Sequence, residues 1–516
     1  MAIIGTLVKK GIKIRETLEQ EYSNPVELQK AELQKLLIHA RNTSFGKNFN
    51  FNAILKGFKQ SGNEFYRLYK DSIPIFDYNK IYSEWWRNCL DGHENVCWPG
   101  RIKYFALSSG TSEDSSKRIP VSGEMIKSIQ KTSFRQILTL SKYTVPNQLF
   151  TSGILMLGGS THLNHHGTFF DGDLSGITAS QLPYWFQQFY KPGKKIAKNP
   201  DWNKKIDEIA AKAKDWKIGI IVGIPAWIQI MLERIIQHNH LNTIHDIWPD
   251  LCIYVHGGVA FDPYRKSFDR LFAKPMIYME TYLASEGFVA FQAHPNTKSM
   301  RIVLNNGIFY EFIPFNHNNF DTDGNLKPNP ETVLINNIKE GTGYAPLLST
   351  NAGAWRYLLG DTIKFTSKED SEIIITGRTK HFLNLCGEHL SIENMNKAIE
   401  SVAEELNITI NEFAVAGIKN GTLWAHQWYV GTEERIDEQL LSLKIDERLK
   451  ALNDDYRVER GAALTAVKVK ILPNIIFYDW MKEHGKIGGQ NKFPRVLKNE
   501  NLLNWEVFLK EMLLNS

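Results

Sequence analysis

Cysteine is scarce in this sequence: four thiols occur among 516 residues, and no two of them form a CxxC pair. No histidines stand near them at zinc-finger spacing, so we predict neither a structural zinc site nor a disulfide framework. Few and unpaired cysteines are typical of a reducing compartment, and we expect a cytoplasmic protein. Charge of one sign is also lacking, since 61 basic and 56 acidic residues leave a net charge of +5. So small an excess argues against a nucleic-acid partner.

Long hydrophobic runs are missing as well. The longest apolar stretch, 218–232, is interrupted by Pro225 and falls short of the roughly 20 residues that span a bilayer. We predict a buried strand followed by a helix there. At the start of the chain the lysines follow a short apolar run, which is the wrong order for a signal peptide. The spacing of apolar residues from Ile3 to Ile14 suits one face of a helix instead, and we expect no membrane partner.

The sequence does contain a pattern of strands alternating with helices. Residues 1 to about 100 look mainly helical. Further along, continuous apolar runs at 153–157, 218–222 and 251–255 alternate with helical patterns. Such runs are typical of strands covered on both faces, as in an α/β sheet. After about residue 300, the strand candidates 308–313 and 372–376 follow one another like a β-meander.

The last part of the chain, from about residue 380, mixes both element types. We expect helices over 393–406 and 436–452, and strands over 413–417 and 466–472. This pattern indicates a compact α+β domain. Its boundary lies near Arg378, where no Pro- or Ser-rich linker stands, so we predict a short hinge. Aromatic residues make up 12% of the chain, and composition alone does not separate core rings from pocket rings.

Two segments carry residue types suited to phosphates and metal ions. The first is a loop rich in hydroxyls that begins at Ser108 and ends at Lys117, where N–H groups, hydroxyls and an ammonium group can surround phosphates. It is not a Walker loop, its two adjacent acidic residues are unfavourable near phosphate, and a Ser-rich surface loop is the alternative. The second places Glu286 after a strand, where a carboxylate suits Mg²⁺. Its alternative is a helix N-terminus capped by Ser285.

Two later segments suit a nucleoside and a basic contact. Asp361 follows a glycine at a predicted tight turn, where it can accept both ribose hydroxyls, and Arg378 follows in the chain. A plain turn in a β-meander explains that pattern equally well. Residues 485–495 combine three glycines with two lysines and an arginine, typical of a mobile basic loop that includes Lys492. A solvated surface loop is the alternative there.

The order and spacing of these segments resemble the adenylate-forming superfamily, which includes acyl-CoA synthetases and firefly luciferase. A closer resemblance, over almost the whole chain, is to the Gretchen Hagen (auxin-responsive) family of acyl-acid amido synthetases. The motifs that carry it are Thr43-Ser44-Phe45-Gly46-Lys47, Phe105-Ala106-Leu107-Ser108-Ser109-Gly110-Thr111-Ser112, Ile247-Trp248-Pro249-Asp250-Leu251 and Gln490-Asn491-Lys492-Phe493-Pro494-Arg495. Two features depart from the family pattern. Asp114 replaces a glycine of the phosphate loop, which either alters the pyrophosphate contacts or marks a bacterial-type member, and the hinge 379–388 differs from plant forms and resembles the general adenylating hinge.

The resemblance implies an ATP-dependent ligase. Such enzymes use ATP and Mg²⁺ to convert a carboxylic acid to acyl-adenylate and pyrophosphate, and an amine, usually an amino acid, then displaces AMP. No nucleophilic triad is expected, because catalysis is positioning and charge neutralisation. The implied fold has a large N-terminal adenylate-forming domain (1–378), with sheets between helices and a β-barrel-like part. A smaller, mobile α+β domain (379–516) would close over it.

The resemblance also implies a role for each site residue. Those that would surround the phosphates are Ser108, Ser109, Gly110, Thr111, Ser112 and Lys117. Around the nucleoside would lie Gly257 and Gly258 near adenine, Tyr282 beside the base, Ser285 near the α-phosphate, Asp361 on the ribose and Arg378 at the hinge. Glu286 would coordinate Mg²⁺, and Lys492 would stabilise the transition state of adenylation. We expect small-molecule partners and a monomer or weak oligomer.

Three questions stay open at this level. CoA is the alternative acceptor, although no dedicated CoA-binding motif is present, and a nucleotide-binding relative without activity is a further alternative. Candidates for an acyl pocket are equally compatible with core packing; they are Met125, Leu163, Phe169, Phe170 and Tyr184. A metal site at His162, His165 and His166 is not favoured, because the flanking glycines suggest a loop and the first carboxylate after them is Asp171.

Overall fold

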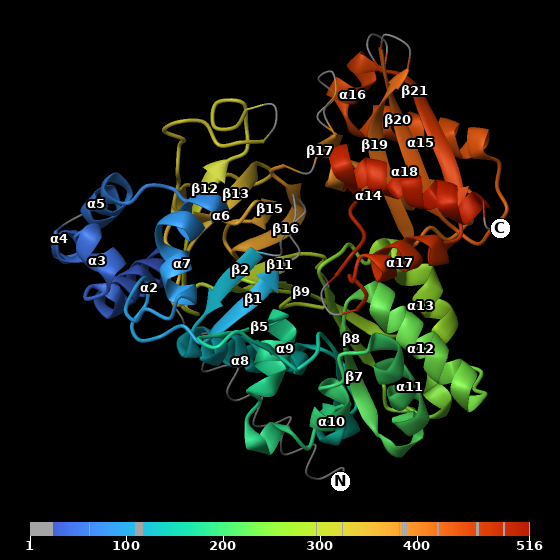
Figure 1. Ribbon diagram of the computed structural model, residues 1–516, viewed down its shortest axis with the longest axis horizontal. Coiled ribbons are helices and arrows are strands. Elements are labelled where there is room, and N and C mark those ends of the chain that lie inside the picture. The colour runs from blue at the N-terminus through green and yellow to red at the C-terminus, as the bar shows by residue number, and fades with distance from the viewer. Residues whose placement is uncertain are drawn as a thin grey trace. The chain divides into compact units, whose positions relative to one another are not determined.

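The computed structural model (Figure 1) describes residues 24–514, except 61, 109–116, 296, 322–323, 381, 384, 386–387, 389, 421–422, 461–463 and 489–490. Tertiary contacts divide the chain into two compact units. Unit 1 consists of Met1–Gly258, Phe272–Asn316 and Asn329–Ile375, and unit 2 of Val259–Leu271, His317–Pro328 and Thr376–Ser516. Two short segments from the middle of the chain therefore pack with the C-terminal residues.

The N-terminal part of unit 1 is helical, as predicted. Its helices are α2 (Pro25–Ala40), α3 (Ser44–Asn48), α4 (Phe51–Gly57), α5 (Glu64–Ser72), α6 (Tyr78–Ile81) and α7 (Arg87–Leu90) (Figure 1). Helix α2 begins where Asn24 accepts a hydrogen bond from the Val26 N–H at 3.0 Å and Pro25 takes the first helical position. The helix predicted from Ile3 to Ile14 lies outside the described residues.

The main sheet of unit 1 has twelve strands among the described residues and confirms the α/β prediction. Its strand order is β12 (Ile308–Pro314), β13 (Gly343–Thr350), β15 (Asp361–Ser367), β16 (Glu372–Arg378), β11 (Met300–Ile302), β10 (Gly287–Phe291), β9 (Ile277–Ala284), β8 (Ile253–Gly257), β7 (Ile218–Gly223), β3 (Gly153–Leu157) and β6 (Tyr190–Lys191), with β14 (Tyr357–Leu358) beside β13. Strands from β6 to β9 pair in parallel, whereas β9, β10, β11 and β16 pair antiparallel. The sheet thus joins a parallel half to the predicted meander.

Helices cover the parallel half of this sheet. After β7, helix α12 (Pro225–Asn239) starts with Pro225 at its first turn and packs beside α11 (Trp202–Lys212) (Figure 1). The apolar stretch 218–232 is therefore a strand followed by a helix, as predicted. Among the residues described, no helix is both long and apolar enough to cross a membrane.

A smaller sheet in unit 1 has the order β2 (Lys117–Val121), β1 (Tyr104–Ser108), β5 (Phe170–Gly172) and β4 (Asn164–His165). Strands β1 and β2 pair antiparallel, and helix α8 (Gly123–Leu138) follows β2. Ser122 caps this helix by accepting a hydrogen bond from the Met125 N–H at 3.0 Å. The hydroxyl-rich loop predicted to bind phosphates consequently joins two paired strands.

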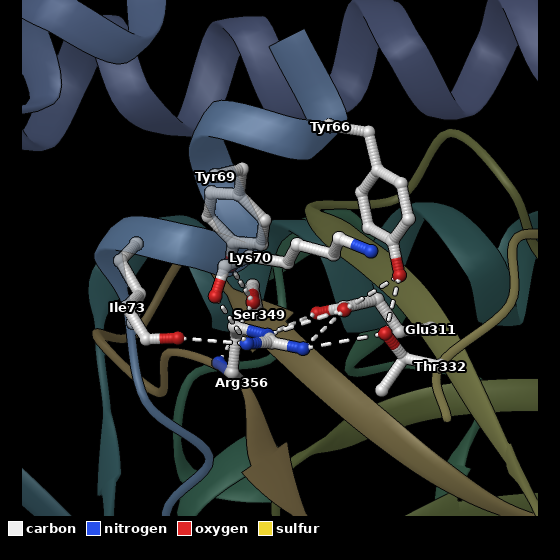
Figure 2. Close-up of polar contacts among 8 residues, drawn as sticks. All are labelled: Tyr66, Tyr69, Lys70, Ile73, Glu311, Thr332, Ser349 and Arg356. Carbon is white, nitrogen blue, oxygen red and sulfur yellow. Dashed lines mark hydrogen bonds and ion pairs between the residues drawn. The ribbon is translucent and has the colours of Figure 1, made fainter. Parts of the chain in front are cut away.

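A buried ion pair joins helix α5 to the antiparallel strands of unit 1 (Figure 2). Arg356 and Glu311 are 4% and 1% exposed, and their charged groups lie 2.9 Å apart. Tyr66 of α5 donates to the Glu311 carboxylate at 3.0 Å, and the Arg356 guanidinium also donates to the Ile73 carbonyl at 2.7 Å. Because the described polar atoms around the pair satisfy its charges, the cost of desolvating them is offset.

Unit 2 is built on a four-stranded sheet with the order β21 (Leu464–Leu472), β20 (Leu423–Gly431), β19 (Glu412–Asn420) and β22 (Val496–Leu497). Its helices include α14 (Ile392–Glu405), α15 (Glu438–Leu452), α17 (Asn474–Glu483) and α18 (Asn499–Leu514). These elements confirm the predicted helices and strands of this region. The segment from the middle of the chain adds η7 (Asp262–Tyr264) and α13 (Arg265–Leu271), and Ser267 donates to the Asn411 side chain at 3.1 Å.

The aromatic residues are largely core. Seven tryptophans belong to the largest fully buried side chains, namely Trp86, Trp227, Trp248, Trp355, Trp428, Trp480 and Trp505. Trp248, which stands in one of the family motifs, donates its indole N–H to the Ala213 carbonyl at 2.9 Å. The aromatic excess of the sequence is thus used mainly for packing.

Candidate functional site

Ser285 and Glu286 form the turn of a β-hairpin in unit 1. Strand β9 ends at Ala284, β10 begins at Gly287, and these two residues face each other across the hairpin. The alternative of a helix N-terminus capped by Ser285 is therefore wrong. Both turn residues are 8% exposed, so a serine hydroxyl and a carboxylate stand side by side in a buried setting. Such a pair of oxygen groups suits a phosphate and its counter-ion.

Tyr282 and Asp361 are brought together across the sheet. The Tyr282 phenol donates to the Asp361 carboxylate at 2.5 Å, a charge-assisted hydrogen bond. Asp361 begins β15 directly after Gly360, whose φ of +87° gives the tight turn that favours glycine. Asp361 therefore does stand at a turn in the meander, and this turn does not conflict with a role in binding the ribose. The bond fixes the phenol of one site residue against the carboxylate of another.

Gly257 and Gly258 stand at the carboxyl end of strand β8, beside β9. Gly257 pairs with Thr281, and a Cβ on Gly257 would lie 2.4 Å from the Thr281 carbonyl oxygen. Only glycine allows that approach of two backbones. Gly258 has a φ of +84°, which turns the chain away from the strand. Thr281 precedes Tyr282, so the two glycines lie one strand away from the Tyr282–Asp361 bond.

The phosphate-loop candidates are only partly described. Ser108 ends β1 directly opposite Lys117, the first residue of β2. Ser109, Gly110, Thr111 and Ser112 lie outside the described residues. The Lys117 ammonium group stands 5.2 Å from the centre of the Tyr78 ring, and the Tyr78 hydroxyl accepts a hydrogen bond from the Arg118 N–H at 2.9 Å. Tyr78 ends another segment that resembles the family, Ile73-Pro74-Ile75-Phe76-Asp77-Tyr78, but nothing in the sequence indicated a place for it at the site.

Lys492 and Arg378 belong to unit 2. Arg378 is half-buried at the end of β16, and Lys492 is exposed in the loop that leads to β22. Next to Lys492, Phe493 is 4% exposed and packs against the rings of Phe477 and Trp505, each with its centre 4.9 Å away. The loop therefore holds a buried ring next to an exposed ammonium group.

The acyl-pocket candidates do not share one environment. Met125 and Phe169 are buried in the core of unit 1, whereas Tyr184 is 90% exposed. Near them, His166 lies 3.0 Å from the buried Asp171 carboxylate, which also accepts a hydrogen bond from the Arg118 guanidinium at 2.9 Å. Within the described part of the chain, no group of three or more histidine, cysteine or acidic side chains is arranged to hold a metal ion.

Family models match most of the chain. The GH3 family N-terminal domain matches residues 14–206, the central domain residues 301–372 and the C-terminal domain residues 393–501. The chain belongs to the GH3 family. Asp361 lies within the central match, whereas Tyr282, its hydrogen-bond partner, precedes that match in the sequence. Lys492 lies within the C-terminal match.

Characterised GH3 proteins are distant relatives in sequence. The chain is 21% identical to an indole-3-acetic acid-amido synthetase of Arabidopsis thaliana over 78% of this chain and 82% of the relative. It is 21% identical to a jasmonoyl-L-amino acid synthetase of Nicotiana attenuata over 76% of each. The solved structure of a GH3.15 acyl acid amido synthetase matches with a TM-score of 0.74 at 16% identity, over 95% of both chains. That structural likeness shows a shared fold.

Proposed function

We propose that this GH3 protein is an ATP-dependent ligase that joins a carboxylic acid to an amino acid. In the first step the acid attacks the α-phosphate of ATP, giving acyl-adenylate and pyrophosphate. In the second step the amine attacks the acyl carbonyl and AMP leaves. The observation that carries the proposal is the match to all three GH3 domain models along one chain. The names of the relatives, an indole-3-acetic acid-amido synthetase and a jasmonoyl-L-amino acid synthetase, support an amide product.

The residues of unit 1 suit the nucleotide of this reaction. Adenine would lie against the flat backbone of Gly257 and Gly258, with the ring of Tyr282 beside it. Asp361 would accept the ribose hydroxyls while the Tyr282 phenol holds its carboxylate in place. Ser108, Lys117 and Ser285 would contact the phosphates, together with Ser109, Gly110, Thr111 and Ser112. Bound in this way, the α-phosphate is held for attack without a nucleophilic side chain.

Glu286 fits a magnesium ion by its chemistry. It offers hard carboxylate oxygens in a hairpin turn beside Ser285, and Mg²⁺ is commonly held by one or two carboxylates plus substrate phosphates. When bound, the ion would neutralise charge on the phosphates. One carboxylate from the protein satisfies this mode of binding, so a cluster of three protein ligands is not required.

Lys492 would supply positive charge to the transition state of adenylation, and Arg378 would contact the ribose or a phosphate. Both residues stand in unit 2, which the GH3 C-terminal domain model matches over 393–501. We propose that a C-terminal domain (379–516) moves relative to an N-terminal domain (1–378) between the two steps. Such closure would exclude water from the reactive acyl-adenylate. The partners would be small molecules, and the protein would act in the cytoplasm as a monomer or weak oligomer.

The first experiment is an ATP–pyrophosphate exchange assay with a panel of aryl, indolyl and fatty acids, followed by an amino acid panel on the best acid. We expect exchange with at least one acid, and amide formation that depends on an amino acid. Acyl-thioester formation with CoA in the absence of any amino acid would contradict an amine acceptor. No exchange with any acid would favour an inactive nucleotide-binding protein.

Substitution of Lys492 tests whether this residue of unit 2 acts on the adenylation step rather than on ATP binding. Lys492→Ala is expected to lower the rate of exchange by about 100- to 1,000-fold, the cost of removing one preorganised charge-stabilising group. ATP binding, measured by calorimetry, is expected to stay close to that of the wild type, because the other proposed nucleotide contacts, most of them in unit 1, are left in place. Equal losses of exchange and of ATP binding would contradict the assigned role.

A further inference from the structure

Unit 2 holds a buried cluster of Tyr264, Glu412 and Arg495 that the proposed reaction does not use directly. Glu412 is 3% exposed and Tyr264 is 1% exposed. The Tyr264 phenol donates to one oxygen of the Glu412 carboxylate, and the Arg495 guanidinium donates to the other at 2.7 Å. The Tyr478 phenol also donates to the oxygen that Tyr264 contacts, at a longer 3.5 Å. A carboxylate so buried depends on these donors, because an unpaired buried charge is costly.

Arg495 connects this cluster to the loop that carries Lys492. It stands three residues after Lys492 and is fixed at both ends. Its carbonyl accepts a hydrogen bond from the Val415 N–H at 2.9 Å, and its guanidinium also donates to the Phe413 carbonyl at 3.0 Å. The same guanidinium lies 4.5 Å from the centre of the Phe413 ring. Together these contacts hold the end of the Lys492 loop against strand β19.

Tyr264 connects the cluster to the chain that leaves the nucleotide site. It lies in η7, six residues after Gly258. The helix that follows it is held within the same unit, because the Lys266 ammonium group donates to the Ala403 carbonyl at 3.3 Å and Ser267 contacts Asn411. Asn411 directly precedes Glu412, the first residue of β19. Glu412 thus receives a fixed donor from each of two segments that are far apart in the sequence.

We propose that Glu412 and Tyr264 are positioning residues for Lys492, acting through Arg495; this inference rests on the proposed function of Lys492. The phenol orients the carboxylate, the carboxylate fixes the guanidinium, and the guanidinium sets the backbone from which the lysine projects. Neither residue contacts substrate in this role. The rate of adenylation is sensitive to such an arrangement, because a displacement of about 1 Å at a reacting group costs up to about 100-fold.

The same unit provides a matched control of nearly the same chemistry. The Tyr456 phenol donates to the Asp446 carboxylate at 2.8 Å, and the Arg460 guanidinium donates to it at 2.7 Å and 2.9 Å. Tyr456 is fully buried, as Tyr264 nearly is. This second cluster lies on α15, on residues 456–460 and at the start of β21, where the Arg460 guanidinium also donates to the Leu464 carbonyl. Removing the phenol breaks a similar hydrogen bond in each cluster. Only the loss at Tyr264 is expected to displace Lys492, because only that cluster includes Arg495.

The test compares Tyr264→Phe with Tyr456→Phe in the full-length protein. We expect both to lower the melting temperature by a similar amount. Tyr264→Phe is expected to reduce kcat for ATP–pyrophosphate exchange by about 10- to 100-fold with the KM for ATP unchanged, whereas Tyr456→Phe keeps the wild-type kcat. Amide hydrogen exchange of the peptide 491–498 is expected to accelerate in Tyr264→Phe alone. Arg495→Lys keeps the positive charge but loses the planar guanidinium group. It is expected to show the same lower kcat and the same faster amide exchange of 491–498.

The hydrogen-exchange measurement separates this inference from the proposed function. If the wild type shows no pyrophosphate exchange with any acid, the proposed function fails, and faster amide exchange of 491–498 in Tyr264→Phe still supports the positioning of the loop. The positioning role is overturned if that peptide exchanges at the wild-type rate in both Tyr264→Phe and Arg495→Lys. It is also overturned if Tyr456→Phe slows pyrophosphate exchange as much as Tyr264→Phe does.

Discussion

At the scale of single residues, the clearest contact in the candidate site is the bond between Tyr282 and Asp361. The sequence indicated that both residues serve one nucleotide, but it did not indicate that they touch. Their strands, β9 and β15, are separated in the sheet by β10, β11 and β16. A contact of this kind depends on sheet order and on which face each side chain takes, and neither is encoded in a local pattern.

The proposed ribose contact of Asp361 predicts a change in sugar selectivity. Asp361→Ala is expected to reduce the preference for ATP over 2′-deoxy-ATP in kcat/KM. A hydrogen bond to a charged group contributes about 1.5–3 kcal/mol, which corresponds to a factor of about 10 to 100. Asp370→Ala, in the exposed turn after β15, serves as the control and should keep the wild-type preference. An unchanged preference in Asp361→Ala would remove the residue from the ribose site.

The buried pair of Arg356 and Glu311 predicts a large loss of stability when one partner is removed. Arg356→Met leaves the Glu311 carboxylate buried with the Tyr66 phenol and without its counter-charge. Loss of one partner of a buried pair costs about 3–5 kcal/mol, which urea unfolding followed by tryptophan fluorescence would detect. The double variant Arg356→Met/Glu311→Leu is expected to recover part of that free energy of unfolding. A double variant no more stable than the single one would show that the unpaired Glu311 carboxylate is not the cause of the loss.

At the scale of elements, most of the fold could be predicted from the sequence. The strand predicted over 153–157 coincides with β3, and the helix predicted over 393–406 differs from α14 by one residue at each end. These elements have apolar runs or periodic faces with clear ends, which is the information that a local pattern carries. Strands of two residues, such as β4 and β22, could not be predicted, because only their partners in the sheet define them.

One buried histidine, which holds the segment before α14 against strand β20, predicts a dependence of stability on pH. The His426 Nε2 lies 3.0 Å from the Glu388 carboxylate, which also accepts a hydrogen bond from the Leu385 N–H at 2.9 Å. Burial lowers the pKa of His426 below its usual value, although the Glu388 carboxylate acts in the opposite direction. Its Nδ1 is buried without a hydrogen-bond partner in the described structure, so a second ring proton would be costly.

The sign of the effect follows from the lowered pKa. Below about pH 6.5 the unfolded chain binds a proton at His426 that the folded chain does not, so unfolding becomes easier as the pH falls. We expect His426→Gln to reduce the loss of unfolding free energy between pH 6.5 and 5 by up to about 1.4 kcal/mol per pH unit. Urea denaturation at several pH values measures it, with pH 8 as the reference. An identical slope in the variant would show that His426 does not titrate in this range.

At the scale of the whole molecule, the sequence did not reveal which segments of the chain belong to each of the two units. A single boundary near Arg378 was expected, whereas contacts assign 259–271 and 317–328 to unit 2. Segment 259–271 has an ordinary composition, and segment 317–328 is rich in the turn-forming residues Asn, Asp, Gly and Pro. Neither pattern indicates the unit with which a segment packs, so only tertiary contacts reveal it. The return of the main chain from unit 1 to unit 2 falls between Ile375 and Thr376, inside strand β16. Gly377, with a φ of +151°, stands at that crossing.

This crossing predicts how the two half-reactions respond to one substitution. If the proposed ligase alternates between two arrangements, the backbone at Gly377 must change conformation at each turnover, and a Cβ there restricts it. Gly377→Ala is expected to leave the rate of the first acyl-adenylate turnover intact and to slow steady-state amide formation by about 10-fold, because an unfavourable positive φ costs about 1–2 kcal/mol. Quenched-flow measurement of acyl-adenylate and amide separates the steps.

Gly341→Ala is the matched control for that measurement. Gly341 also has a positive φ, +76°, and an added Cβ there would meet nothing within 4 Å, but it lies in a turn within unit 1. Its substitution therefore imposes comparable backbone strain away from the crossing, and both half-reactions should keep their wild-type rates. If Gly377→Ala slows adenylation as much as amide formation, the crossing contributes to stability alone. If Gly377→Ala slows only amide formation, the change between the two arrangements of the units limits turnover. That change is not controlled by any single residue of the site.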